Sequence, residues 1–176
     1  EKNAYAQILS ALKNQKTEIH FKNFKDYKKL SSIYKTLLDD NPDIFWVKTA
    51  ASGCKYNGKK VFDTYMRFTY SMSKDKMKST QKQLQKKANA LLKGLPKSSE
   101  YAKVKYIYEQ VVDNVSYDYV TTSKKENQLI TSAMLKGKSV CAGYTKMYTY
   151  LLQKAGISCM MLSGKADKQS HAWDIV

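Results

Sequence analysis

The residues that most constrain the fold of this chain surround Cys141, where the sequence predicts that a loop ends and a helix begins. Gly137 and Ser139 precede the cysteine as loop and N-cap candidates. Apolar side chains then recur at helical spacing: Tyr144, Tyr148, Leu151, Leu152 and Ala155. Gly156 stands where a left-handed residue commonly ends a helix. A cysteine in the first turn faces unpaired backbone N–H groups and the positive end of the helix dipole, and both favour the nucleophilic thiolate.

A histidine follows this helix at a distance that a folded chain can close. Residues 157–164 predict a buried strand, residues 164–170 a polar loop, and His171 begins a second apolar strand that runs to Val176. A strand–loop–strand arrangement would bring the imidazole of His171 back to the start of the cysteine helix. A cysteine nucleophile with a histidine beside it is the minimum set of residues for thiol acyl transfer. A buried structural cysteine and a packed histidine are the common alternative, and the spacing alone does not decide between them.

The wider context of these residues resembles a known family. Val140-Cys141-Ala142-Gly143-Tyr144-Thr145, then a helix, then Ala155-Gly156-Ile157 and His171-Ala172-Trp173 are similar to the core of the transglutaminase-like superfamily, whose fold is related to that of papain. The resemblance extends upstream through residues 104–108 and 115–118 and is strongest over residues 99–176. Residues 41–46 resemble a segment that precedes the core in bacterial secreted members. The resemblance implies that Cys141 is the nucleophile and His171 the general base and acid.

The third catalytic residue of the family has no counterpart in this chain. In the family an Asp on the strand after the histidine strand orients the imidazole, and this sequence stops at Val176. Asp174 does not take that role, because a separation of three residues on a strand places it on the face opposite His171. The sequence therefore resembles a form that ends just before its last catalytic residue.

Composition limits the kinds of partner that the chain suits. The formal net charge is +16, but of the 31 basic residues only Arg67 is an arginine, the residue that bidentate phosphate binding and base readout favour. No zinc-finger spacing or glycine-rich phosphate loop accompanies the charge, so we expect no specific nucleic-acid binding. An anionic polymer or cell wall remains a suitable nonspecific partner. Cys54, in an expected loop, Cys141 and Cys159 form no metal or disulfide pattern, and we expect no cofactor and no metal.

The N-terminal half predicts helices and a β-hairpin. Helical periodicity covers residues 1–15, 24–38 and 74–93, and residues 44–48 are expected to form a strand. Asn57-Gly58 predicts a type I′ hairpin whose return strand, 61–72, carries Phe62 on a buried face. Ser98 or Ser99 is expected to cap a further helix with a buried stripe of Tyr101, Val104, Tyr108, Val111 and Val115.

These observations predict an α+β protein: a papain- or transglutaminase-like core, N-terminal helices and a small antiparallel β-sheet that carries the His171 strand. We expect two parts, a helical and β-hairpin subdomain at 1–96 and the core at 97–176. Two functions stay open. One is acyl transfer by Cys141 and His171 on a peptide or carboxamide bond, in a fragment that the missing Asp leaves of uncertain activity. The other is a non-catalytic binding module whose basic face contacts anionic polymers.

Partners and location follow from the same considerations. Acyl transfer implies a protein or peptide substrate. If the sheet is incomplete, the strand of His171 lies near an exposed edge, which favours self-association. The family resemblance implies a bacterial protein that is extracellular or at the cell surface.

Overall fold

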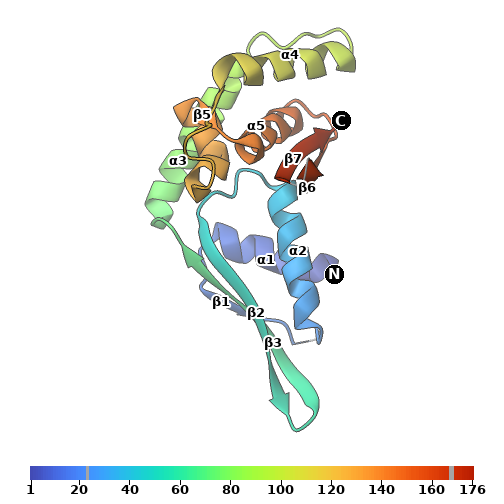
Figure 1. Ribbon diagram of the computed structural model, residues 1–176. Coiled ribbons are helices and arrows are strands. Elements are labelled where there is room, and N and C mark those ends of the chain that lie inside the picture. The colour runs from blue at the N-terminus through green and yellow to red at the C-terminus, as the bar shows by residue number, and fades with distance from the viewer. Residues whose placement is uncertain (23, 167–168) are drawn as a thin grey trace. The chain divides into compact units, whose positions relative to one another are not determined.

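The computed structural model describes residues 1–22, 24–166 and 169–176 (Figure 1). Helices and strands mix along the chain in an α+β arrangement. In chain order they are α1 (Lys2–Lys13), β1 (Glu18–His20), α2 (Tyr27–Asp40), β2 (Val47–Asn57), β3 (Lys60–Tyr70), α3 (Lys74–Leu91), α4 (Glu100–Asn114), β4 (Ser116–Tyr117), a 3₁₀ turn (Lys125–Gln128), a π-helical turn (Ser132–Lys136), β5 (Lys138–Ser139), α5 (Cys141–Lys154), β6 (Met160–Ala166) and β7 (Gln169–Ile175).

The chain forms two compact units. The first contains residues 1–38 and 46–78, and the second contains residues 39–45 and 79–176. The division expected at 96/97 falls inside the second unit and stays a prediction. Cys141 and His171 both belong to the second unit, so the candidate chemistry lies within a single compact body.

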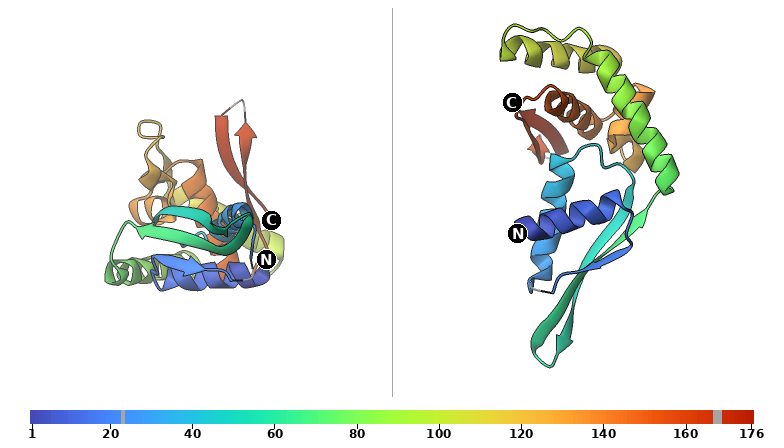
Figure 2. Two further views of the ribbon diagram at one scale, coloured as in Figure 1. Left: turned by 90° about the horizontal axis from the view of Figure 1, so that it is seen from below. Right: turned by 180° about the vertical axis from the view of Figure 1, so that it is seen from behind.

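The first unit packs helices against an antiparallel sheet of order β1-β3-β2 (Figure 2). Its core contains Ile8 and Leu12 of α1, Leu30 and Leu37 of α2, and Met66 and Phe68 of β3, each no more than 2% exposed. The indole nitrogen of Trp46 donates to the Leu12 carbonyl across 3.0 Å, which satisfies the polar atom of a large buried side chain.

The predicted hairpin is present, but its turn differs in detail. Gly58 and Lys59 form the loop, and only Gly58 adopts a positive φ, of 58°, while Asn57 still pairs with Lys60 in the ladder. The expected strand at 44–48 begins only at Val47, and Cys54 lies in β2 rather than in a loop. Phe62 was wrongly expected in the core: it is 60% exposed, because the outer part of the β2–β3 hairpin extends past α1 and α2 (Figure 1).

Helix α4, in the second unit, begins as predicted, but only part of its predicted stripe is buried. Ser99 caps the helix by accepting a hydrogen bond from the Ala102 N–H over 3.1 Å. Ile107 and Val111 are buried, whereas Tyr101 and Tyr108 are 76% and 58% exposed and were wrongly assigned to the core. Tyrosine fits either face of an amphipathic helix, because its ring is apolar and its hydroxyl is not.

Helix α5 and the β6–β7 hairpin pack against each other in the second unit. Met147, Leu151 and Leu152 are fully buried, and Gly156 has the left-handed φ of 74° predicted for the residue after the helix. β6 and β7 pair antiparallel with Gly164 opposite His171, and the hairpin packs against α5 (Figure 2). The strand expected at 157–164 starts at Met160 and is largely exposed. The expected loop at 164–170 includes residues 167 and 168, which lie outside the described residues.

Candidate active site

Cys141 is the first residue of α5, and the helix start around it lacks a side-chain cap. Its N-cap is Val140, in an extended conformation, whose side chain makes no capping hydrogen bond. The Val140 carbonyl accepts from the N–H groups of Gly143 and Tyr144, at 2.9 and 3.2 Å. In the described part of the chain, no acceptor contacts the N–H groups of Cys141 and Ala142. The half-buried thiol therefore stands beside two free backbone donors at the positive end of a helix.

Ser139 does not cap this helix, contrary to the sequence prediction. Its buried hydroxyl donates to the carbonyl of Asn127, which also accepts from the Val140 N–H over 3.2 Å. A hydroxyl engaged with this carbonyl at a buried position is not free to turn toward the helix. The residue thereby fixes the loop before Cys141 and leaves the helix donors open.

A polar network built on Asp118 supports this loop. The carboxylate is 4% exposed and accepts from the Val120 and Thr121 N–H groups, from the Thr121 hydroxyl and from the Asn127 amide, the last over 2.7 Å. The Thr121 hydrogen bonds, with smaller effects from the Val120 N–H and the charge of Lys138, hold the pKa of Asp118 well below its usual range. Asp118 is therefore ionised at all ordinary pH values.

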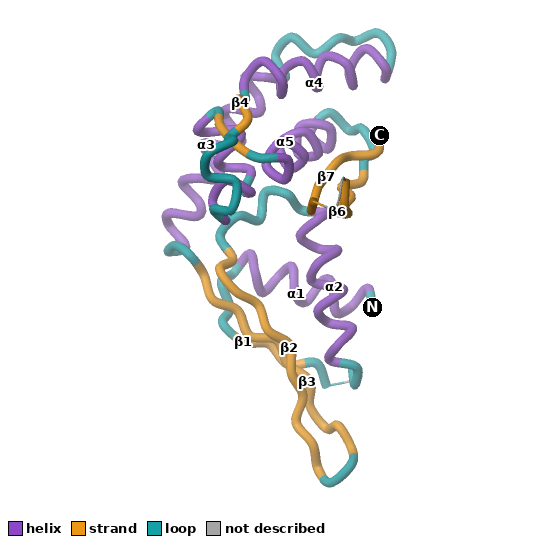
Figure 3. The backbone as a smooth tube through the Cα atoms, viewed as in Figure 1, coloured by secondary structure: helices purple, strands orange, loops and turns teal. Residues whose placement is uncertain are grey.

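Asn127 connects the Asp118 network to the residues before the nucleophile. The single hydroxyl proton of Ser132 is shared between the Lys138 carbonyl oxygen, at 2.7 Å, and the amide oxygen of Asn127, at 3.3 Å. β4 and β5 pair in parallel, with Tyr117 opposite Ser139, and Figure 3 shows these short strands beside the start of α5. Sequence reasoning missed the roles of Asp118, Asn127 and Ser132, although Asp118 belongs to the segment 115–118 that resembles the family.

Gly143 is required by the close approach of two backbone segments. A Cβ atom at this position would lie 1.9 Å from Ser139 Oγ and 3.2 Å from the Asn127 carbonyl oxygen. Any larger residue would displace Ser139 from the loop that positions Cys141. The glycine of the Cys-Ala-Gly sequence is thus explained by packing in the first turn of α5.

His171 lies on the exposed side of the β6–β7 hairpin. Its ring stacks on that of Trp173, with centroids 6.0 Å apart, as two residues on one strand face allow. Among the described residues the ring makes no hydrogen bond or ion pair, so its pairing with Cys141 stays a prediction. The chain reverses twice between α5 and β7. The two elements therefore run in the same direction, and a hydrogen bond joins Thr149 of α5 to Asp174 of β7. From this bond, His171 lies roughly 10 Å back along β7, and Cys141 lies roughly 12 Å back along α5.

Asp174 faces α5, on the side of the hairpin opposite His171. Its carboxylate accepts a hydrogen bond from Thr149 Oγ1 over 2.5 Å. Burial raises the pKa of Asp174 to about 6, and the hydrogen bond from Thr149 opposes this only in part. Burial, with a smaller effect from the same carboxylate, raises the pKa of the nearby Cys159 thiol. The alternation of faces that excluded Asp174 as a partner of His171 thus agrees with the position of its side chain.

The described residues give no sign of a metal centre or of a helix that spans a membrane. No group of three or more His, Cys, Asp or Glu side chains in that part of the chain is arranged to hold a metal ion. None of its helices combines the length and apolarity that a bilayer crossing needs. Cys54, Cys141 and Cys159 all carry free thiols.

Comparison with known proteins assigns a family to this arrangement. The model of the transglutaminase-like superfamily matches residues 85–176, which include α5 and both strands of its hairpin. The chain belongs to the transglutaminase-like superfamily. A solved structure described as a TGase aligns with 89% of this superfamily member at 16% identity and a TM-score of 0.49, and the chain spans 47% of that structure's length. No curated protein matches the sequence.

Proposed function

We propose that this protein is a thiol acyl-transfer enzyme with Cys141 as its nucleophile. The observation that carries the proposal is the position of Cys141 as the first residue of α5, where its own N–H group and that of Ala142 have no acceptor among the described residues. Such donors stabilise both a thiolate and the oxyanion that forms when a carbonyl is attacked. Membership of the transglutaminase-like superfamily supports the same chemistry.

The proposed reaction has two steps. The Cys141 thiolate attacks a carboxamide or peptide carbonyl, a C–S bond forms, and the N–H groups of Cys141 and Ala142 donate to the oxyanion. The C–N bond then breaks, and the proton taken from the thiol passes through His171 to the departing ammonia or amine. Water hydrolyses the thioester to an acid, or a lysine amine converts it to an isopeptide, and either route returns the free thiol.

The first experiment measures the iodoacetamide alkylation rate of each cysteine from pH 4 to 9, read by peptide mass. We expect Cys141 to react faster than Cys54 and Cys159 below pH 7, and the advantage to fall in His171→Ala. Cys141→Ser identifies the labelled peptide. Equal rates at the three thiols would contradict the proposal. A turnover assay then separates ammonia release in water from incorporation of a primary amine, with the same variants as controls.

A second function is supported by the lysines of α3. Lys74, Lys76, Lys78, Lys82 and Lys86 are exposed along this helix, and Asp75 is the acidic residue of its first turn. Such a face suits an anionic polymer, as at a bacterial cell surface, and we propose this location on the family resemblance. Affinity for a polyanion should fall steeply between 50 and 200 mM salt. Binding that is indifferent to salt, or lost in Cys141→Ser, would rule out this role for the lysines.

Self-association is proposed from the β6–β7 hairpin, the strands of which pair only with each other in the described structure. Its outer face exposes Met160, Trp173 and Ile175, which are 56%, 40% and 51% accessible. Light scattering at rising protein concentration should show a dimer that Ile175→Lys weakens. A monomer at millimolar concentration would remove this proposal.

A further inference from the structure

A cluster of tyrosine rings includes that of Tyr144, three residues after Cys141 on α5, and the reaction proposed above does not use it. We define the tyrosine platform as Tyr117, Tyr119 and Tyr144. The ring centroids of Tyr117 and Tyr119 are 4.9 Å apart, and those of Tyr117 and Tyr144 are 6.0 Å apart. Tyr119 is 83% exposed and Tyr117 37% exposed. Exposed aromatic rings in mutual contact are a recurrent feature of binding surfaces.

The platform is held in place by fixed backbone. The Tyr144 hydroxyl donates to the Val115 carbonyl, which locks its ring against the end of α4. Tyr117 lies in β4, opposite Ser139 of β5, and the Asp118 carboxylate holds the N–H groups of Val120 and Thr121 immediately after Tyr119. One end of the platform is therefore tied to the Asp118 network that supports the loop before Cys141, and the other end to the last residues of α4. A preformed surface binds without the cost of ordering its side chains.

The platform lies within reach of any group bound at the thiol. Tyr144 follows Cys141 by three residues on α5, a spacing that puts the two Cβ atoms about 5–6 Å apart on one side of a helix. An extended peptide advances about 3.3 Å per residue, so a substrate whose carbonyl meets Cys141 can reach these rings with a neighbouring side chain.

The chemistry of the platform selects a planar, uncharged group. Tyrosine faces favour stacking with aromatic rings. The adjacent carboxylate, that of Asp118, is buried and engaged, with Lys138 Nζ 3.6 Å away, and the whole chain carries a net charge of +16. A cationic side chain would consequently meet the charge of Lys138 rather than a free carboxylate. An aromatic residue of the substrate gains the contact without that penalty.

We infer that the tyrosine platform is a subsite for an aromatic side chain next to the reacting carboxamide of a peptide acyl donor. The inference rests on the proposed function, because it takes Cys141 as the nucleophile. It specifies the substrate class as a peptide with Phe, Tyr or Trp beside the acyl residue.

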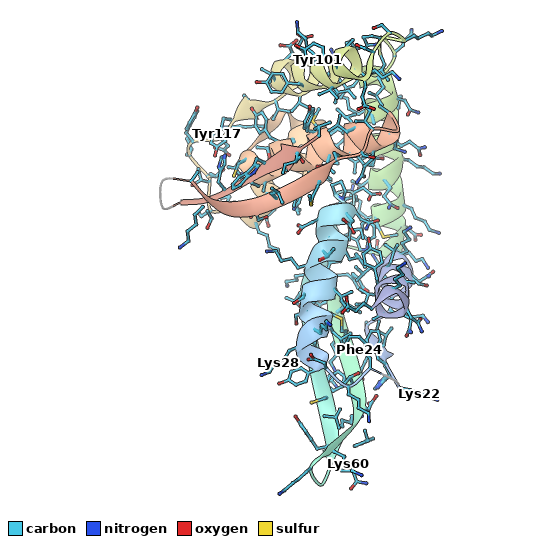
Figure 4. The ribbon with its side chains drawn as sticks, turned by 90° about the vertical axis from the view of Figure 1, so that its right-hand side faces the viewer. Lys22, Phe24, Lys28, Lys60, Tyr101 and Tyr117 are labelled. Carbon is cyan, nitrogen blue, oxygen red and sulfur yellow. The ribbon has the colours of Figure 1, made fainter. Side chains whose placement is uncertain are left out.

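The test compares the alkylation of Cys141 by iodoacetyl-phenylalaninamide and iodoacetyl-alaninamide, each rate divided by the iodoacetamide rate of the same variant. We expect the phenylalanine probe to be favoured about five- to tenfold, in line with one aromatic contact. The ratio of the phenylalanine-probe rate to the alanine-probe rate should fall toward one in Tyr119→Ala and Tyr117→Ala. Tyr101→Ala is the control: this tyrosine is 76% exposed, close to the 83% of Tyr119, but lies on α4, well away from Tyr117 (Figure 4). Its ratio should match that of the wild type.

The outcomes separate the subsite from the proposed function. Rapid iodoacetamide labelling of Cys141 with a phenylalanine-to-alanine ratio of one overturns the subsite and leaves the nucleophile in place. Slow labelling of Cys141 by all three reagents overturns the proposed function. A ratio that persists in Tyr119→Ala and Tyr117→Ala also overturns the subsite. Protection of Cys141 by a chitin oligosaccharide, but not by an unreactive phenylalanine peptide, would assign the rings to a sugar and refute the peptide inference.

Discussion

Helices α4 and α5 begin in opposite ways, although each has a serine just before its start. Ser99 is the N-cap of α4 and satisfies the Ala102 N–H, and Glu100 adds an acidic residue to the first turn. Ser139 lies two residues before α5 and satisfies a loop carbonyl instead, and the first turn of α5 has neither a cap nor an acid. The start of α4 is built for stability, whereas at the start of α5 the N–H groups of Cys141 and Ala142 meet no acceptor among the described residues.

The largest effect should come from Gly143→Ala, which tests how tightly the uncapped start is packed. The added methyl group overlaps Ser139, so we expect a loss of about 1–3 kcal/mol in the free energy of unfolding, measured with urea. The rate of Cys141 alkylation should change as well, because Ser139 fixes the loop before Cys141. In a double-mutant cycle Ser139→Gly should recover part of the loss. Additive effects would mean that Ser139 is not the residue that excludes the methyl group.

Ser99→Ala tests the capped helix. Loss of the hydrogen bond to the Ala102 N–H should cost about 1 kcal/mol of unfolding free energy and leave the rate of Cys141 alkylation unchanged. Ser98→Ala, one residue earlier, serves as the control. A change in thiol reactivity in Ser99→Ala would show that the two helix starts are coupled.

Asp174 of β7 contacts α5 farther along the helix, where it accepts a hydrogen bond from Thr149. Its pKa of about 6 lies above the value in an unfolded chain, so the folded state binds more protons between roughly pH 4 and 6 and stability falls as pH rises through that window. Because part of the side chain meets water, we expect a loss of about 1 kcal/mol rather than the full value of the shift.

The matching variant is Asp174→Asn, which keeps an acceptor for Thr149 and cannot ionise. Its unfolding free energy should vary less with pH between 4 and 7 than that of the wild type, and should exceed it at pH 7. Asp113→Asn, at an exposed position on α4, controls for net charge. A wild type that becomes more stable from pH 4 to 7 through Asp174 would refute this assignment.

The smallest effect is expected when α5 is given the cap that it lacks. In Val140→Thr the new hydroxyl oxygen can accept from the Ala142 N–H, which should slow Cys141 alkylation by about two- to fivefold, the size of a helix-terminus effect. Val140→Ala is the control, because it also removes apolar contact made by Val140 but supplies no hydrogen-bond acceptor. Equal rates in these two variants would argue against a role for the open N–H groups.

Local signals predicted the framework that carries the candidate site. Periodicity located α5 at Cys141, Gly156 marked its end, and Ser99 capped α4. The stripe of α4 was misassigned in part, because tyrosine counts as apolar in a pattern although Tyr101 and Tyr108 are largely exposed.

Contacts between distant residues could not be read from the sequence in the same way. Ser139 has the chemistry of a cap, but a carbonyl twelve residues earlier, that of Asn127, competes for its hydroxyl. The Asp118 network depends likewise on a loop conformation that no periodicity encodes. The predicted pair of Cys141 and His171 needs the relative placement of a helix and a hairpin, and the alkylation series is its test.

The turn at Gly58 and Lys59 has a practical consequence. It ends an exposed hairpin of the first unit, and a Cβ atom at Gly58 would meet nothing within 4 Å. Tips of this kind tolerate inserted residues. A short tag placed there would attach the protein to a surface or report on the first unit by fluorescence, while leaving every residue around Cys141 unaltered in sequence.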